Sequence, residues 1–126
     1  MVSLRIANRP YSERKISETF LDFVAPLMAA AGTGATKGQV EQALKIAFTV
    51  WNSVVFDTKR GNTAYLTRIR QLTVNDPLSA ALVEQMISRK RALFGDDLRL
   101  IGEYRLTQKN GKWRLWAEAR DPVTSH

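Results

Sequence analysis

Residues 98–120 read LRLIGEYRLTQKNGKWRLWAEAR, with apolar and polar side chains alternating on both sides of Asn110-Gly111. This period of two is typical of a β-strand that has one buried face. An Asn-Gly dipeptide between two such segments favours a tight hairpin turn, because both residues readily adopt positive φ angles. The sequence therefore predicts an antiparallel β-hairpin over residues 98–120.

The position of the turn sets which residues lie opposite each other in this hairpin. The expected pairs are Leu106 with Leu115, Tyr104 with Ala117, Gly102 with Ala119, Glu103 with Glu118 and Arg105 with Trp116. One face is apolar and is expected to cover the helices, since an isolated hairpin is barely stable in water. That face carries Tyr104, Leu106, Trp113, Leu115, Ala117 and Ala119. The other face carries Ile101, Glu103, Arg105, Thr107, Arg114, Trp116, Glu118 and Arg120.

Apolar side chains before the hairpin recur at helical spacing and predict four helices. These are expected from Ser17 to a stop at Gly32-Thr33-Gly34, from the cap Thr36 to Phe56 or Asp57, from about Thr63 to Thr73, and from Pro77 to Phe94. Ser17 and Asn62 are expected to be N-caps, because their side chains can accept from the free amides of a first turn. Pro26 is expected to kink or break the first helix. The second helix is apolar on more than one face, which predicts a central position.

Together these elements predict an α+β fold that is mostly α, with about four helices followed by a C-terminal antiparallel β-hairpin packed on them. The chain of 126 residues fits one domain. We expect a basic N-terminal arm over residues 1–15, the domain over 16–121 with its hairpin at 98–120, and a tail over 122–126.

The composition excludes several classes of protein and site. There is no cysteine, so disulfides, thiolate metal sites and cysteine nucleophiles are absent. No apolar run approaches the roughly 18 residues that a membrane-spanning helix needs, and the first residues lack the apolar core of a secretory signal. We therefore expect a soluble, cytoplasmic protein with no membrane association. A net charge of +7 attracts polyanions, so nucleic acid is a candidate partner.

Residues that could support catalysis are few. His126 is the only histidine and is the last residue, and no phosphate-binding loop or nucleophile elbow occurs. Four carboxylates near the hairpin could form a magnesium or general-acid site, or could be a solvated set of charges that connects helix to strand. They are Asp96, Asp97, Glu103 and Glu118. We expect no metal and no cofactor.

The charged face of the hairpin is the best candidate for binding. Arg105 should lie across from Trp116, and an arginine over an indole is a favourable cation–π pair. Tryptophan and arginine are also preferred anchors of protein interfaces, while basic residues beside an exposed aromatic suit stacking on nucleic-acid bases. Trp116 could instead be buried under the N-terminal arm or a helix. The candidate partner-binding residues are Ile101, Arg105, Arg114, Trp116 and Arg120.

Two features of the helices have structural and functional interpretations. Asn52 lies in the most apolar helix, where it is expected to hydrogen-bond and fix the packing of a neighbour, or alternatively to face a ligand pocket. The basic run Arg89-Lys90-Arg91 lies in the last turn before Gly95. There it is expected to offset the helix dipole rather than to form one binding patch.

Three functions fit these residues. The sequence favours a non-catalytic accessory or regulatory protein that binds another protein or a second copy of itself. The first alternative is a nucleic-acid-binding protein that uses the hairpin face and the basic arm with Arg5, Arg9, Arg14 and Lys15. The second alternative is an enzyme that uses the carboxylates.

Overall fold

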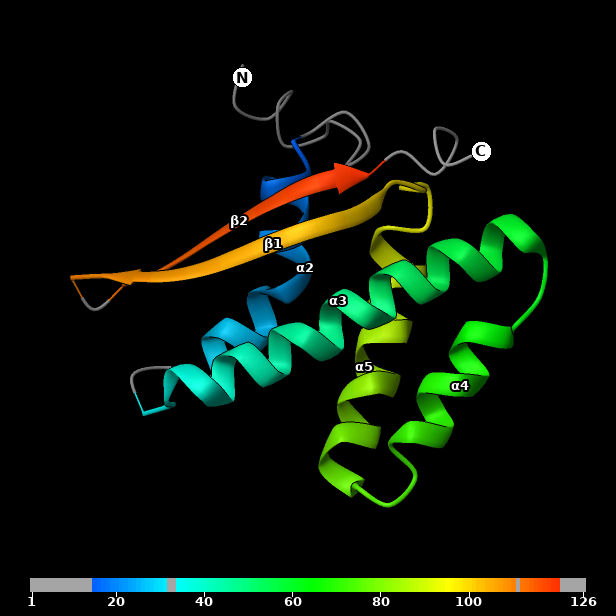
Figure 1. Cartoon of the computed structure of the whole chain (residues 1–126), viewed down its shortest axis with the longest axis horizontal. Coiled ribbons are helices and arrows are strands. Elements are labelled where there is room, and N and C mark those ends of the chain that lie inside the picture. The colour runs from blue at the N-terminus through cyan, green and yellow to red at the C-terminus, as the bar shows by residue number, and fades with distance from the viewer. Residues whose placement is uncertain (1–14, 32–33, 111, 121–126) are drawn as a thin grey trace.

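The computed structural model describes residues 15–31, 34–110 and 112–120 (Figure 1). Within these ranges the chain forms four helices and one antiparallel pair of strands. The elements are α2 (Ile16–Ala31), α3 (Lys37–Arg60), α4 (Ala64–Leu72), α5 (Pro77–Leu93), β1 (Leu100–Lys109) and β2 (Lys112–Arg120). The predicted fold class, four helices followed by a hairpin that packs on them, is confirmed.

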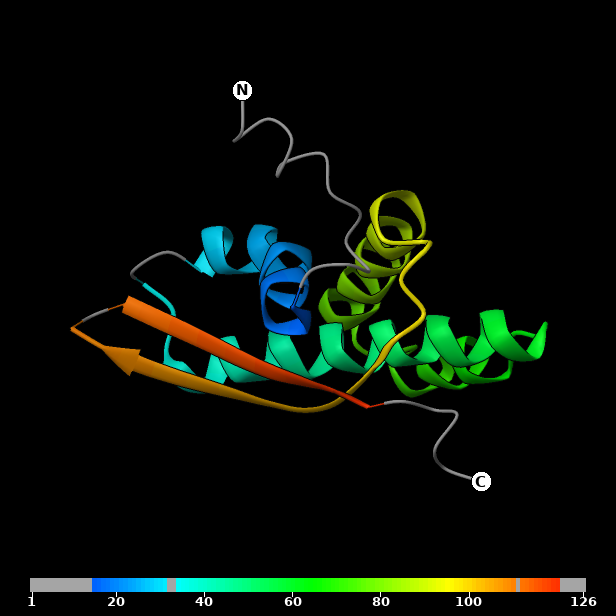
Figure 2. The ribbon, with the colours of Figure 1, turned by 90° about the horizontal axis from the view of Figure 1, so that it is seen from above.

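Helix α3 is the centre of the molecule, as its apolar faces predicted. It packs against α2, α4, α5 and β1, while α2 also packs against β2. Figure 1 shows the hairpin in front of α2 and above α3, with α5 crossing α3 near its middle and α4 beside the C-terminal part of α3. Both helices that touch the strands lie on the same side of the hairpin, so its opposite side is left uncovered by the described helices (Figure 2).

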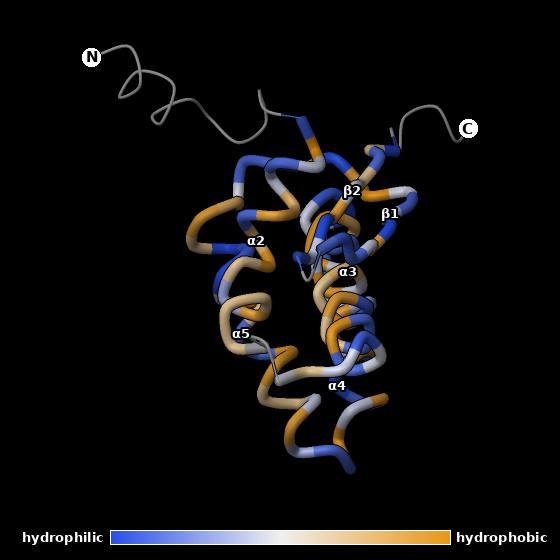
Figure 3. The backbone as a smooth tube through the Cα atoms, turned by 90° about the vertical axis from the view of Figure 1, so that its left-hand side faces the viewer, coloured by the Kyte–Doolittle hydropathy of each residue, from blue (hydrophilic) through white to orange (hydrophobic). Residues whose placement is uncertain are grey.

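The core is built around three aromatic rings from separate parts of the chain. Phe23 of α2 meets Trp51 of α3 edge-on at 5.2 Å and Phe94 at 5.5 Å between ring centroids, and all three residues are buried. Edge-to-face contacts of this kind add to the stability that burial alone provides. Figure 3 shows the hydrophobic stretches along α2, α3 and α5 that surround this cluster.

Helix α2 continues through Pro26 to Ala31. A proline has no N–H, so the carbonyl of Asp22 loses its bond within the helix. Arg89 of α5 replaces it: Nη2 donates to the Asp22 carbonyl at 2.7 Å, and Nε donates to the Phe23 carbonyl at 2.9 Å. Arg89 therefore satisfies carbonyls of another helix.

Of the two expected N-caps, Ser17 is wrong and Asn62 is incomplete. Ser17 lies inside the first turn of α2, and its hydroxyl bonds the backbone of Ala117 in β2. Asn62 accepts one amide of α4, from Ala64. The next two amides, of Tyr65 and Leu66, donate to the buried carboxylate of Asp57 at 3.0 Å each. Helix α3 also extends beyond Asp57 to Arg60. Its C-cap is Gly61, which has a left-handed φ of 68°.

The register of the hairpin agrees with the prediction from the turn as far as Glu103. Leu106 pairs with Leu115, Tyr104 with Ala117, Arg105 with Trp116 and Glu103 with Glu118. The predicted pair of Gly102 with Ala119 is wrong, because a β-bulge at Gly102 brings Ile101 opposite Ala119. A bulge adds one residue to one strand, so every side chain before it changes face.

Asn52 holds β1 against α3 next to this bulge. Its Oδ1 accepts from the Ile101 N–H at 2.8 Å, and its Nδ2 donates to the Ile101 carbonyl at 2.9 Å. One side-chain amide thus pairs both backbone groups of a strand residue, as a neighbouring strand would. The expectation that Asn52 fixes the packing of a neighbour is confirmed.

Candidate partner-binding site

The outer face is the side of the hairpin that points away from the helices. The pleat assigns to it the residues Glu103, Arg105, Thr107, Arg114, Trp116, Glu118 and Arg120, all exposed. Its orientation follows from the residue between two of them, since Tyr104 lies 5.9 Å from Phe20 and 5.1 Å from Phe48, ring centroid to ring centroid. Alternate residues point to opposite sides of a strand, so Arg105 points outward.

Trp116 is the large apolar residue of this face. It is 43% exposed, and the guanidinium of Arg105 lies over its ring at 5.0 Å from the centroid. At an exposed site such a pair is worth about 0.5–1 kcal/mol, which orients the two side chains without burying them. The described part of the chain therefore leaves part of the Trp116 indole and the Arg105 side chain exposed to solvent.

The charges around this pair are mixed. Arg105 Nε lies 3.9 Å from Glu103 Oε1, with both side chains more than half exposed. Glu103 is opposite Glu118 across the strands, with Arg105 beside the first of them. Exposed pairs of this kind contribute little to stability. The face thus offers separate positive and negative groups on both sides of one aromatic ring.

Ile101 does not belong to this face, and its prediction as a surface residue is wrong. The bulge at Gly102 turns Ile101 to the inner side, where it is 2% exposed and part of the core. A side chain in that position cannot contact a partner. The glycine in the strand was the signal for the bulge, because glycine inside a strand often marks one.

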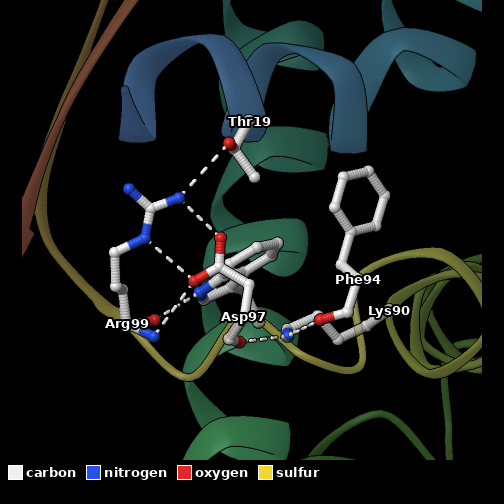
Figure 4. A network of polar contacts seen from close by, with 6 residues as sticks. Thr19, Lys90, Phe94, Asp97 and Arg99 are labelled. Carbon is white, nitrogen blue, oxygen red and sulfur yellow. Dashed lines mark hydrogen bonds and ion pairs between the residues drawn. The ribbon is translucent and has the colours of Figure 1, made fainter. Parts of the chain in front are cut away.

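The carboxylates that could have formed a catalytic site are separated. Asp97 is buried and binds Arg99 through two contacts, at 2.9 Å from Nε to Oδ1 and 2.6 Å from Nη2 to Oδ2 (Figure 4). It is committed to this ion pair, whereas Glu103 and Glu118 lie on the outer face. Among the described residues, no group of three side chains is arranged to hold a metal ion.

Lys90 lies beside the same ion pair, inside the protein (Figure 4). It is 1% exposed, and its ammonium donates to the carbonyls of Phe94 at 2.6 Å and Asp97 at 2.7 Å. The ammonium also lies 4.1 Å from the ring centroid of Trp51. Burial lowers the pKa of Lys90 to about 8, against the attraction of Asp97. The basic run is therefore split: Arg89 and Lys90 serve the fold, and Arg91 is exposed.

Two hollows were not anticipated from the sequence. The larger, of about 720 Å³, lies between the start of α3 and the middle of β1. Its lining residues are Gly38, Glu41, Gln42, Lys45, Tyr104, Arg105, Leu106 and Thr107. The smaller, of about 340 Å³, is apolar and lies between the end of α2 and the start of α3, where Leu27, Met28 and Val40 line it. Hollows depend on how elements approach, which residue spacing does not report.

Several predicted features lie outside the described residues, namely the arm residues Arg5, Arg9 and Arg14 and the terminal His126. Among the helices that are described, none is long and apolar enough to cross a bilayer. Comparison with protein-family models, with curated proteins and with solved structures finds no match to this chain.

Proposed function

We propose that this chain is a non-catalytic accessory or regulatory protein that binds a partner protein through the outer face. The observation that carries the proposal is the exposed indole of Trp116 beneath the guanidinium of Arg105. Tryptophan and arginine are enriched among the few residues that dominate binding energy in protein interfaces, where surrounding contacts exclude water. Arg114, Glu118 and Arg120 provide such a polar rim.

The mixed charge of the outer face favours a protein over a nucleic acid. Glu103 and Glu118 lie on the face itself, where a phosphate backbone would be repelled. The strands do carry more base than acid, with Arg105, Lys109, Lys112, Arg114 and Arg120 against these two glutamates. A nucleic-acid partner is thus the competing result that the experiment must separate.

A carboxylate enzyme has less support. Neither Glu103 nor Glu118 lines either of the two hollows described above. A reacting substrate needs a concave site that brings it to both groups.

The test is affinity capture from the cells that make the protein, at low salt, followed by mass spectrometry and an absorbance ratio for nucleic acid. Three forms are compared: the wild type, Trp116→Ala, and Leu72→Ala. Leu72 is 75% exposed on α4 and serves as a control, an apolar truncation far from the hairpin. We expect one protein to be enriched by the wild type and by Leu72→Ala, and to be lost with Trp116→Ala.

The proposal fails if Trp116→Ala retains the partner, or if nucleic acid is recovered and is released steeply by salt. Circular dichroism of each variant is the control for intact folding. Because Trp116 is 43% exposed, its truncation should lower the free energy of unfolding by roughly 1–3 kcal/mol. Size-exclusion chromatography of the pure protein shows whether the partner is a second copy.

A further inference from the structure

The edge of β1 that faces α3 has unpaired backbone groups. Lys109 and Lys112 flank the two-residue turn, so they form the hydrogen-bonded type of pair. Pairs alternate along an antiparallel ladder, which leaves the N–H and C=O of Tyr104, Leu106 and Gln108 pointing away from β2. Ala117 agrees with this assignment. It is the partner of Tyr104, and both its N–H and its C=O bond the Ser17 hydroxyl at 2.8 Å.

Each edge of the hairpin is closed by one helix side chain at the end far from the turn. Ser17 closes β2 at Ala117, and Asn52 closes β1 at Ile101. Nearer the turn, none of the described residues hydrogen-bonds the outward backbone groups of Tyr104, Leu106 or Gln108. An open edge of this kind is a template for another strand.

The larger hollow runs along this open edge. One wall is β1 from Tyr104 to Thr107, and the other is the face of α3 that carries Gly38, Glu41 and Lys45. The space at Gly38 is open, because a Cβ built there would meet only Thr36 Oγ1, at 3.9 Å. The hollow of about 720 Å³ is thus a groove beside unpaired strand groups.

The groove carries net positive charge. Lys45 has no ion pair among the described residues, and the Arg105 side chain is 68% exposed, with its Nε 3.9 Å from Glu103 Oε1. The acidic residue of the groove, Glu41, lies 3.8 Å from Lys37, which offsets its charge. An entering segment that carries carboxylates is therefore favoured over a basic one.

We propose that the edge of β1 and the face of α3 form a binding groove for an extended acidic peptide segment of a partner protein. The peptide adds to β1 as a third strand, and its backbone pairs with Tyr104, Leu106 and Gln108. A carboxylate on the outer side lies beside Arg105, as a cross-strand pair. Residues 104–108 span about 13 Å at ~3.3 Å per residue, so the bound segment is a short one of about five residues.

This inference goes beyond the proposed function. The groove lies on the α3 side of β1, whereas Trp116 lies on the solvent side of the hairpin. Either surface can bind when the other does not. The experiment below therefore uses a defined peptide, and Trp116→Ala tests the outer face while Lys45→Glu tests the groove, since Arg105 lies on both surfaces.

The probe is fluorescein-labelled Thr-Val-Glu-Val-Glu-Val-Thr, titrated with the full chain and followed by fluorescence anisotropy. Two further peptides are N-methylated, one at its valines and one at its glutamates. Backbone N–H groups of a strand alternate in direction, so one of these peptides loses two or three donors toward β1 and the other loses none. We expect saturable binding of the parent, retained by one methylated peptide and weakened at least about tenfold in the other, since each lost hydrogen bond costs about fivefold.

Protein variants test the same edge from the other side. Gln108→Pro removes an N–H that points away from β2, so the hairpin ladder is kept, and Gln108→Ala is the matched control that retains the N–H. We expect the proline variant to weaken binding about fivefold and the alanine variant to leave it unchanged. Lys45→Glu should weaken binding of the acidic peptide. It should strengthen binding of a peptide that has lysine in place of each glutamate.

Three results would overturn the proposal: no saturable binding at millimolar protein, equal effects of both methylated peptides, or loss of peptide binding with Trp116→Ala but not with Lys45→Glu. The methylated peptides need no protein variant, so the test stands even if Gln108→Pro does not fold. Amide shifts confined to residues 104–108 and α3 in an NMR titration would support the assigned edge.

Discussion

At the scale of single residues, several partly buried polar side chains bond the backbone of a distant segment. Asn52, Ser17 and Arg89 each bond carbonyls or amides of another element. The sequence could predict that Asn52 bonds something, because a polar group in an apolar helix must be paired. It could not predict the partner of Ser17. A serine near a helix start can accept from its own first turn or bond a remote strand, and only the fold decides which.

Lys90 leads to a prediction about pH. Its pKa is about 8 in the folded protein against an ordinary 10.5, so between these values the unfolded chain binds more protons. The free energy of unfolding contributed by this group therefore rises with pH over that window, by at most about 1.4 kcal/mol per pH unit.

The measurement is urea unfolding at pH 7, 8, 9 and 10 for the wild type and Lys90→Met. The difference between them isolates Lys90, since other titrating groups are shared. The variant leaves the Asp97 carbonyl without its lysine donor, which lowers its stability at every pH. A constant difference from pH 8 to pH 10 would show that the ammonium is not destabilised by burial.

Asn52 leads to a prediction about stability. Asn52→Ala leaves both backbone groups of Ile101 without their partner, next to the core. We expect a loss of about 2–4 kcal/mol in the free energy of unfolding, measured with urea. Thr49→Ala, on an exposed position of the same helix, is the control and should cost less than about 1 kcal/mol. Equal losses would mean that Asn52 contributes no more than a surface residue.

At the scale of elements, the hairpin shows how much of a strand register the sequence pattern can predict. The turn at Asn110-Gly111 predicted the correct register for the pairs nearest to it, since both strands count residues from that point. The count failed at Gly102, where one extra residue is inserted. A bulge leaves only a weak trace in sequence, so Ile101 was placed on the wrong face.

The N-cap expected for α4 was incomplete for a related reason. The start of α4 is capped from Asp57, which is eight residues before Tyr65 and lies at 4% exposure inside α3. Pattern rules search the residues directly before a helix for its cap. The signal in the sequence is Asp57, an acidic residue on the apolar face of the preceding helix.

The bulge supports a prediction about deletion. Removing Gly102 would make Ile101 directly precede Glu103, so simple alternation would keep Ile101 opposite Ala119 on the inner face. We expect the deletion to leave Ile101 buried and to cost less than the roughly 2–3 kcal/mol in the free energy of unfolding that exposing one isoleucine would cost. Gly102→Ala keeps the bulge but brings a Cβ to 3.1 Å from Arg120 Cβ, so it should cost about 1 kcal/mol. A deletion that costs about 2–3 kcal/mol or more by urea unfolding would contradict this reading of the bulge.

At the scale of the whole molecule, the net charge of +7 was expected to attract polyanions. The described structure spreads its basic groups: Lys90 is buried, Arg89 and Arg99 serve the fold, and others line the hairpin and the groove. Charge at this scale acts on the rate of encounter more than on the final contact. The sequence could supply the sum of the charges but not their positions, which depend on how the helices and strands pack.

The charge leads to a kinetic prediction for the acidic peptide. Raising the salt concentration from about 0.05 M to about 0.5 M should lower its association rate, because the Debye length falls to a few ångströms. Its dissociation rate should change much less, since backbone hydrogen bonds hold the bound strand. Stopped-flow anisotropy measures both rates. A salt effect mainly on dissociation would mean that ion pairs, not strand addition, hold the peptide.

The bonds that close the two edges of the hairpin also impose an order on folding. Ser17 and Ala117 are 100 residues apart in the chain, and Asn52 and Ile101 are 49 apart. During synthesis α2 and α3 leave the ribosome long before the strand residues that bond the side chains of Ser17 and Asn52. Contacts of such sequence separation form late, because the long loop must close first. We therefore expect α2 to stay incompletely docked until β2 is complete, so that a strand residue translated 100 residues after Ser17 finishes the packing of α2.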